Sequence, residues 1–253
     1  MNANRIAVLA ITRPGVALAG RLVAALPGVH LFVPAALGPQ AAVAAPGAHT
    51  GYDGPTRDLM PGLFADWEAI VATFSLGALV RLIAPHLRDK YRDPAVLVLD
   101  EAGRFVIPVL SGHLGGANAL AAHVARVLGA TAVLTTASDV QQTIAVDLLG
   151  RELGWTLQAS SADLLRASAA VVNGEPVALV QESGSPDWWR GHANGRNGPL
   201  PSNLHCLDPG EALDSGDYRA LLWIGSGTPP ASLIAGFDGP VIVYLAKEST
   251  LVR

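Results

Sequence analysis

The sequence predicts an α/β fold, with an N-terminal open, mostly parallel sheet with flanking helices, followed by a smaller α/β central domain. Short β-branched or apolar runs alternate with segments of helical periodicity, a pattern typical of α/β sheets. Small polar residues and glycines separate each run from the helix that follows. The 253 residues, 50% of them hydrophobic, suffice for one large or two modest domains. We expect an N-terminal domain of residues 1–140 and a central domain of residues 141–253.

The first elements follow from local signals. Residues 5–11 form an apolar run that ends at Thr12 and precedes Pro14 and Gly15. Proline and glycine suit the turn and first positions of a helix, here expected over residues 16–26. Residues 29–34 are expected to form the second strand. Residues 35–62, rich in Ala, Gly and Pro, are interpreted as a long loop of the kind that borders an active site.

The next segment contains a predicted hairpin. Residues 69–74 are expected to form a strand, and Ser75 is expected to cap a helix that Pro85 kinks or ends. Residues 95–100 and 105–110 are apolar runs joined by four residues, a connection short enough for a hairpin. One antiparallel pair is therefore predicted within the sheet.

A glycine-rich turn, another helix and a strand complete the N-terminal domain. The helix after the turn is expected to stop at Gly129, and residues 132–136 are expected to form the strand. The central domain is expected to open with a helix over residues 145–154.

The sequence of the rest of the central domain gives weaker indications of helices and strands. A Ser-Ser-Ala-Asp sequence at residues 160–163 indicates a helix N-terminus. Strands are predicted over residues 176–182, 220–225 and 241–246. Residues 183–202 are interpreted as an exposed loop, whose Trp188 and Trp189 could cover a flat ring or dock a partner.

Composition excludes several classes of protein. A net charge of −4 argues against a general nucleic-acid binder. The single Cys206 excludes an intrachain disulfide, a thiolate zinc site and an iron–sulfur site held by this chain alone. No apolar run approaches the ~18–20 residues of a membrane span. Residues 5–11 are too short for a secretory core, so a cytoplasmic location is expected. His-Glu-x-x-His is absent, and we expect no metal site in the protein.

The turn at residues 111–118, Ser-Gly-His-Leu-Gly-Gly-Ala-Asn, carries the most chemical information. Its glycines permit close backbone approach, and His113 can move a proton near pH 7. Such a turn can cradle an oxyanion or a carboxylate; the alternative is that it serves only tight strand-to-helix packing. Ser111 lacks the Gly-x-Ser-x-Gly elbow and resembles a helix cap more than a nucleophile. Neither a dinucleotide fingerprint nor a phosphate-binding P-loop is present.

Four strand-to-helix turns are expected to meet at the carboxyl ends of the strands, where ligands lie in open α/β sheets. These turns cover residues 12–15, 73–77, 111–118 and 135–139. The densest charge lies nearby in sequence, over residues 81–104. It is either a solvated surface or a group of cations that binds substrate carboxylates, with Asp100 or Glu101 available as a base.

Three motifs point to a family. Asp-Lys-x-x-Asp-Pro, Asp-Glu-x-Gly-Arg-Phe and Ser-Gly-His-x-Gly-Gly-Ala-Asn occur in this order within residues 80–139. This run resembles the cobalt-precorrin-5A hydrolases of anaerobic cobalamin biosynthesis, the CbiG type. The resemblance implies hydrolysis of the δ-lactone of a cobalt-containing tetrapyrrole and release of acetaldehyde, giving cobalt-precorrin-5B. Cobalt then belongs to the substrate, and the protein needs no cofactor.

The resemblance and the turn chemistry together suggest roles for individual residues. Lactone opening needs an activated water and stabilisation of an oxyanion, so His113 is expected to act as general acid and base. The other candidate catalytic residues are Ser111, Asp100 and Glu101. Backbone amides are expected to bind the oxyanion at Gly112, Gly115 and Gly116. The substrate carboxylates are expected to bind to Arg81, Lys90 and Arg104. Further substrate contacts are expected from Asn118, Ser75, Thr136 and Asp139.

Two other functions stay open from the sequence. Many family members carry a further C-terminal domain, so the chain is alternatively a non-catalytic tetrapyrrole-binding subunit that needs a separate C-terminal-domain partner. Without the resemblance, an α/β enzyme acting on a phosphorylated metabolite is the third hypothesis. A homodimer is a further expected assembly, and neither nucleic acid nor membrane is an expected partner.

Overall fold

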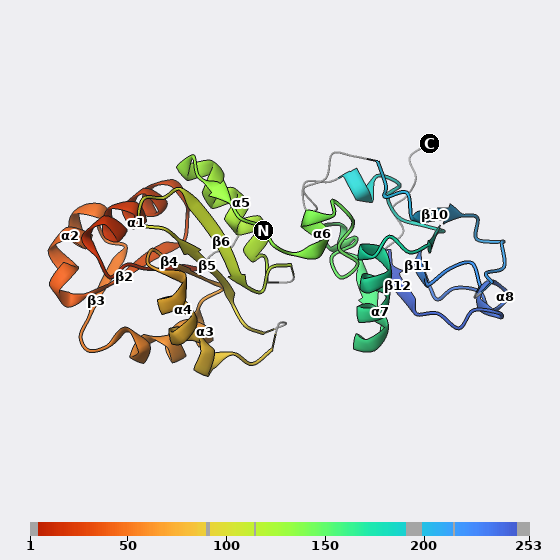
Figure 1. The fold of residues 1–253 in the computed structure, drawn as a ribbon, viewed down its shortest axis with the longest axis horizontal. Helices are drawn as coiled ribbons and strands as arrows, with labels where there is room; N and C mark the ends of the chain where they lie inside the picture. Colours follow the sequence, from red (N-terminus) through yellow and green to blue (C-terminus); the bar gives the residue numbers. More distant parts are fainter. Residues whose placement is uncertain (1–4, 90–91, 114, 191–198, 215, 247–253) are drawn as a thin grey trace. The chain divides into compact units, whose positions relative to one another are not determined.

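The chain forms two compact units, Met1–Leu134 and Thr135–Arg253, in the computed structural model (Figure 1). The structure describes residues 5–89, 92–113, 115–190, 199–214 and 216–246. Each unit has its own sheet and its own buried apolar clusters, which confirms the predicted fold class. Contacts divide the chain after Leu134, slightly before the boundary expected after residue 140.

The first unit contains a seven-stranded sheet of order β3-β2-β1-β4-β5-β6-β7. Strands β1 to β5 all run parallel, whereas β6 runs antiparallel to β5 and parallel to β7. The predicted hairpin is therefore confirmed. The strands span Ile6–Leu9 (β1), Val29–Pro34 (β2), His49–Tyr52 (β3), Ala69–Ala72 (β4), Ala95–Leu99 (β5), Phe105–Leu110 (β6) and Thr131–Ala132 (β7).

Helices cover both faces of this sheet (Figure 1). One face carries α1 (Arg13–Ala25), α2 (Gly38–Ala44) and α5 (Ala117–Leu128). The other carries α3 (Met60–Asp66) and α4 (Leu76–Ile83). Short 3-10 helices span Ala35–Leu37 (η1), Thr56–Leu59 (η2) and Ala84–His86 (η3).

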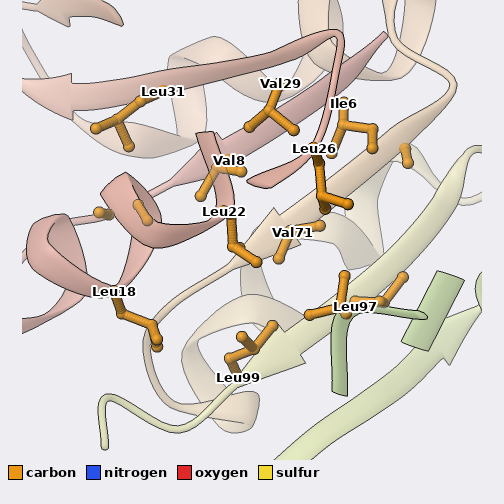
Figure 2. Packing of buried hydrophobic residues seen from close by; sticks show 14 of the residues in the cluster. Ile6, Val8, Leu18, Leu22, Leu26, Val29, Leu31, Val71, Leu97 and Leu99 are labelled. Carbon is orange, nitrogen blue, oxygen red and sulfur yellow. The ribbon is translucent and has the colours of Figure 1, made fainter. Parts of the chain in front are cut away.

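Alternation along the strands builds the two cores of the first unit. Successive strand residues point to opposite faces, so Val8 packs toward α1 while Leu9 packs toward α3 and α4. Figure 2 shows Leu22 of α1 lying over Val8 and Val71 of the sheet. Because both faces are covered, the parallel strands are continuously apolar rather than alternating in polarity.

Several local predictions for this unit are confirmed. Pro14 occupies the first turn of α1, and Gly129 ends α5 in a left-handed conformation with φ 69°. Ser75 is the N-cap residue of α4, which ends at Ile83, just before Pro85.

The long loop expected over residues 35–62 is wrong. That segment contains α2 and β3, and it leads into α3. Its Ala41 and Ala45 are buried against α1, so tertiary packing stabilises a helix that is too short to be stable alone. The strand expected over residues 132–136 is also shorter, because β7 ends at Ala132.

The second unit contains a five-stranded sheet of order β10-β9-β11-β12-β8. Strand β8 is antiparallel to β12, and the other four run parallel. The strands span Thr156–Gln158 (β8), Val177–Gln181 (β9), Leu204–Leu207 (β10), Ala220–Gly225 (β11) and Val241–Leu245 (β12). The helices span Ala137–Val140 (α6), Ser161–Val172 (α7) and Ala231–Ile234 (α8), with 3-10 turns at Arg151–Leu153 (η4) and Trp188–Arg190 (η5).

Two predictions for the second unit are wrong. Residues 145–154 form turns and η4 rather than an α-helix. Gly150 has φ 72°, and a β-carbon there would lie 2.0 Å from the Trp155 ring, so the chain turns tightly around that indole. Trp188 is also not exposed: it is 6% accessible and packs in the core with Val146 and Leu149. Residues 191–198 of the same expected loop lie outside the described residues.

Within the described ranges, no helix combines the length and apolar character that a membrane crossing requires.

Leu97 tests the core of the first unit. It is fully buried in the centre of the sheet, so Leu97→Ala removes apolar burial and leaves a cavity. The free energy of unfolding is expected to fall by about 2–5 kcal/mol. Val43, on α2, is 82% exposed, and Val43→Ala is expected to change stability by less than about 0.5 kcal/mol. Urea unfolding measures both; equal losses would contradict the assigned core.

Candidate functional site

The predicted site residues of the first unit lie at opposite edges of its sheet. Asp100 and Glu101 follow the carboxyl end of β5, whereas Leu110, the last residue of β6, pairs with Val96 near the start of β5. Strand β5 is five residues long, so at about 3.3 Å per residue the two groups are roughly 15 Å apart. The expectation that the turns at Ser75 and Ser111 share one site is therefore wrong.

The reason is the reversal of β6. The carboxyl end of an antiparallel strand lies beside the amino ends of its neighbours. The turn at residues 111–118 thus leaves the sheet at the amino edge of β4 and β5, although its sequence resembles that of an ordinary strand-to-helix turn.

The carboxyl edge of the sheet holds hydroxyl and carboxylate groups. The Thr12 hydroxyl donates to Glu101, and the same oxygen accepts from the N–H of Gly15 at 3.2 Å. The buried Thr73 hydroxyl donates to Leu9 O at 3.2 Å. A β-carbon on Gly15 would lie 2.7 Å from Thr73 Oγ1, so glycine lets α1 approach β4 closely. These contacts join the ends of β1, β4 and β5.

Ser75 and Arg81 belong to α4 at this carboxyl edge. Ser75 is exposed, and its side chain makes no capping hydrogen bond. The exposed Arg81 reaches back one turn, where Nη1 donates to Gly77 O at 3.0 Å. The structure therefore brings Arg81 to the first turn of α4.

Asp100 and Arg104 close the β5–β6 turn. Asp100 Oδ1 accepts from the N–H groups of Arg104 and Phe105 at 2.8 and 2.7 Å, and Oδ2 accepts from Arg104 Nε at 3.0 Å. Partial burial opposes ionisation of Asp100, but the hydrogen bonds from Phe105 and Arg104 outweigh it and lower the pKa of this carboxyl. A carboxylate that binds its proton so weakly is a poor general base. Its role is to hold the hairpin.

Ser111 anchors the glycine-rich turn to the start of β5. Its hydroxyl donates to Asp93 O at 2.9 Å, and its backbone is left-handed with φ 57°, a conformation that a non-glycine residue adopts at a cost of about 1–2 kcal/mol. The carboxylate of Asp93 in turn accepts from the N–H groups of Arg88 and Asp89. The expectation that Ser111 caps the helix is wrong, because the N-cap residue of α5 is Gly116.

Hydrogen bonds within the turn occupy one of the backbone amides that were expected to bind an oxyanion. The N–H of Gly116 donates to His113 O at 3.0 Å, and the N–H of Asn118 donates to Gly112 O at 2.9 Å. The oxyanion role expected for the Gly116 amide is therefore wrong in this conformation. His113 is half-buried and Asn118 is buried.

The remaining predicted residues are Thr136, Asp139 and Lys90. Thr136 and Asp139 belong to the second unit. There the Thr136 hydroxyl donates to the Asp139 carboxylate at the start of α6. Lys90 lies outside the described residues.

A cavity of about 210 Å³ adjoins the glycine-rich turn. Its lining combines small side chains with three ionisable ones, Glu68, His123 and Arg126. None of these three side chains is among the site residues predicted from the sequence. The sequence does place His123 and Arg126 three residues apart on one face of α5, opposite its buried Val124 and Leu128.

Among the described residues, no group of three or more His, Cys, Asp or Glu side chains is arranged to hold a metal ion.

Two family models match the chain. Residues 58–139 match the model described as Cobalamin synthesis G N-terminal, and residues 144–224 match Cobalamin biosynthesis central region. The first match contains both the β5–β6 hairpin and the glycine-rich turn, and the second covers most of the second unit.

Curated relatives agree with these matches. A protein named cobalt-precorrin-5A hydrolase from Priestia megaterium is 46% identical over 172 residues, which is 68% of this chain and 44% of that protein. Its namesake from Salmonella typhimurium is 38% identical over 184 residues, 73% of this chain and 48% of that protein. The chain thus spans about half the length of these relatives.

A solved structure from Sulfolobus solfataricus, described as a homolog of cobalamin biosynthesis protein G, is 16% identical with a TM-score of 0.49. The similarity covers 98% of this chain and 61% of that one.

Gly115 tests the packing of the glycine-rich turn. A β-carbon at Gly115 would lie 2.3 Å from the Ser111 β-carbon, so Gly115→Ala is expected to displace the turn and cost about 1–3 kcal/mol. Gly62, in α3, has no atom within 4 Å of such a β-carbon, and Gly62→Ala is expected to leave stability unchanged or raise it by up to about 1 kcal/mol. Urea unfolding measures both, and similar effects at the two positions would refute the close packing.

The pH dependence of stability in Asp100→Asn tests whether the Asp100 carboxylate holds the β5–β6 hairpin. Because its pKa is lower in the folded protein than the ordinary 3.8, its ionised form stabilises the fold above that pH, and the stabilisation is lost as the pH falls through the folded-state pKa. Asp100→Asn is therefore expected to lower the free energy of unfolding at pH 7 and to lower it by less at pH 3, below the ordinary pKa of 3.8. Asp58, which is largely exposed, provides the control Asp58→Asn. A loss for Asp100→Asn that is the same at both pH values would contradict the assigned contacts.

Proposed function

Since the chain belongs to the cobalamin synthesis G family through its N-terminal and central regions, we propose that it acts as a cobalt-precorrin-5A hydrolase. In this reaction water opens the δ-lactone of a cobalt tetrapyrrole, and acetaldehyde leaves to give cobalt-precorrin-5B. The 46% identity to a protein of that name, over 68% of this chain, carries the proposal. The cavity beside the glycine-rich turn supports it.

The chemistry needs proton transfer at two points. Addition of water to the lactone carbonyl forms a carbon–oxygen bond and breaks the ring ester bond, which frees an alkoxide. Collapse of that oxygen to an aldehyde breaks a carbon–carbon bond and leaves the electron pair on the macrocycle. A group that removes a proton from water and later returns one fits both steps.

His113 is the residue to which we assign this proton transfer. It lies in the same turn as Gly115 and Gly116, which line the cavity. Asp100 and Glu101 lie at the opposite edge of the sheet, so we give them no part at this cavity. We propose no resident cofactor, with cobalt carried by the substrate, and a cytoplasmic location.

The alternative is a subunit that binds the macrocycle without turning it over. Such a subunit would need a partner protein for turnover. Either form is compatible with a homodimer.

Anaerobic incubation with cobalt-precorrin-5A tests the activity, with acetaldehyde measured by a coupled alcohol dehydrogenase assay. His113→Gln is expected to lower kcat by about 10²–10⁴-fold while the substrate Kd stays unchanged. His205→Gln, an exposed histidine on β10, is the control and is expected to keep full activity.

Three other results would support different conclusions. A wild-type protein that shifts the substrate spectrum without releasing acetaldehyde would favour the binding subunit. Full turnover by His113→Gln would show that the proton-transfer assignment is wrong. Binding of a simple phosphate ester but not of the tetrapyrrole would favour an enzyme of phosphorylated metabolites.

A further inference from the structure

The cavity at the amino edge of the first sheet has a floor of small residues. Ala69 and Ala95, the first residues of β4 and β5, line it together with Gly115, Gly116, Ala119 and the larger Leu120. Small side chains let a ligand approach the backbone closely. The volume of about 210 Å³ is below the ~300–1,000 Å³ of pockets that enclose a whole small-molecule ligand. The cavity therefore suits one arm of a larger molecule rather than a macrocyclic ring.

One wall of the cavity consists of hydrogen-bond donors. Arg126 Nη1 lies 3.3 Å from His123 Nδ1. A guanidinium has no acceptor, so Nδ1 accepts and the ring proton lies on Nε2. The pair thus presents the remaining guanidinium N–H groups together with one imidazole N–H. All of these groups donate, and one of them carries a positive charge.

The guanidinium of Arg126 makes no ion pair with the described residues. Within the part of the chain that the structure describes, no carboxylate lies within ion-pairing distance of Arg126. Glu68 also lines the cavity and is exposed. A ligand carboxylate is therefore attracted toward α5 and repelled from Glu68.

We propose that Arg126 and His123 bind one carboxylate arm of the macrocyclic substrate and position the ring beside the glycine-rich turn. The identity of this ligand rests on the proposed function, because that tetrapyrrole bears carboxylate side chains. A planar guanidinium matches a carboxylate with two parallel N–H···O bonds. Arg126 and His123 are substrate-binding residues, and neither takes part in the proton transfer.

A structural role for Arg126 makes a different prediction. Arg126 lies in the last turn of α5, where a positive charge stabilises the helix dipole. In that case its replacement lowers the thermal unfolding midpoint and leaves substrate affinity unchanged. The binding role predicts the reverse.

Anaerobic absorbance titration with cobalt-precorrin-5A tests the proposal, with the full chain in the His113→Gln background so that substrate is not consumed. Adding Arg126→Gln is expected to raise Kd about tenfold, which corresponds to one charge-assisted interaction. Arg126→Lys is expected to raise it less, because lysine keeps the charge but not the planar fork. Glu68→Gln is expected to lower Kd.

Arg166→Gln is the matched control. Arg166 is an exposed arginine of α7 that pairs loosely with Asp163, and the same loss of charge there is expected to leave Kd unchanged. In the otherwise wild-type protein, Arg126→Gln is expected to raise KM while kcat and the unfolding midpoint stay the same.

The outcomes separate this inference from the proposed function. A wild-type protein that releases no acetaldehyde would overturn the activity, while the Kd comparison would still decide the role of Arg126. Equal Kd values for Arg126→Gln and Arg166→Gln would overturn the carboxylate site even if acetaldehyde is released. A lower unfolding midpoint with unchanged Kd would assign Arg126 to helix stability. Absence of tetrapyrrole binding by the wild type would overturn both proposals.

Discussion

The hydrogen bonds that Asp100 accepts close the turn between β5 and β6, and the direction of β6 follows from that turn. One carboxylate holds the N–H groups of both Arg104 and Phe105, while Gly103 adopts φ 66°. The chain therefore reverses instead of crossing over the sheet as after β1 and β4. Because β6 leaves the sheet at its amino edge, the glycine-rich turn and α5 are also placed there. The cavity beside them depends on this reversal.

Because β6 runs antiparallel to β5, the carboxyl and amino edges of the sheet carry different functional groups. The carboxyl edge, where open α/β sheets usually bind ligands, has its Thr12, Thr73 and Glu101 engaged with one another or with backbone. The amino edge has the cavity, with donors from α5 and a carboxylate at Glu68. Internal hydrogen bonds already use the Gly116 amide, so side chains rather than that amide present donors to a ligand. A ligand in this cavity therefore meets donors from side chains rather than a cradle of helix amides.

Much of the fold could be predicted because its signals are local. The strands at residues 29–34 and 105–110 have the bounds that their apolar runs predict, and Gly129 and Pro85 end helices for steric reasons that act on one or two residues. The failures involve packing contacts that apolar periodicity does not reveal. The α2 helix depends on burial against α1, and residues 145–154 lose their predicted helix because Gly150 turns the chain around Trp155. Trp188 is a core residue for a similar reason, since its indole N–H donates to Gln181 at 3.1 Å.

The candidate site, like the fold, could be predicted only in part. By itself the sequence determined the α/β class, the hairpin and the family resemblance, because each is encoded in residue type and short-range spacing. Tertiary structure alone decided which edge of the sheet that turn faces, and hence that its neighbours are Glu68, His123 and Arg126 rather than Ser75, Arg81 and Arg104. The physical reason is that strand direction reverses across a hairpin. The turn that follows β6 therefore lies at the amino edge of the sheet, whereas the turns that follow β1, β4 and β5 lie at its carboxyl edge.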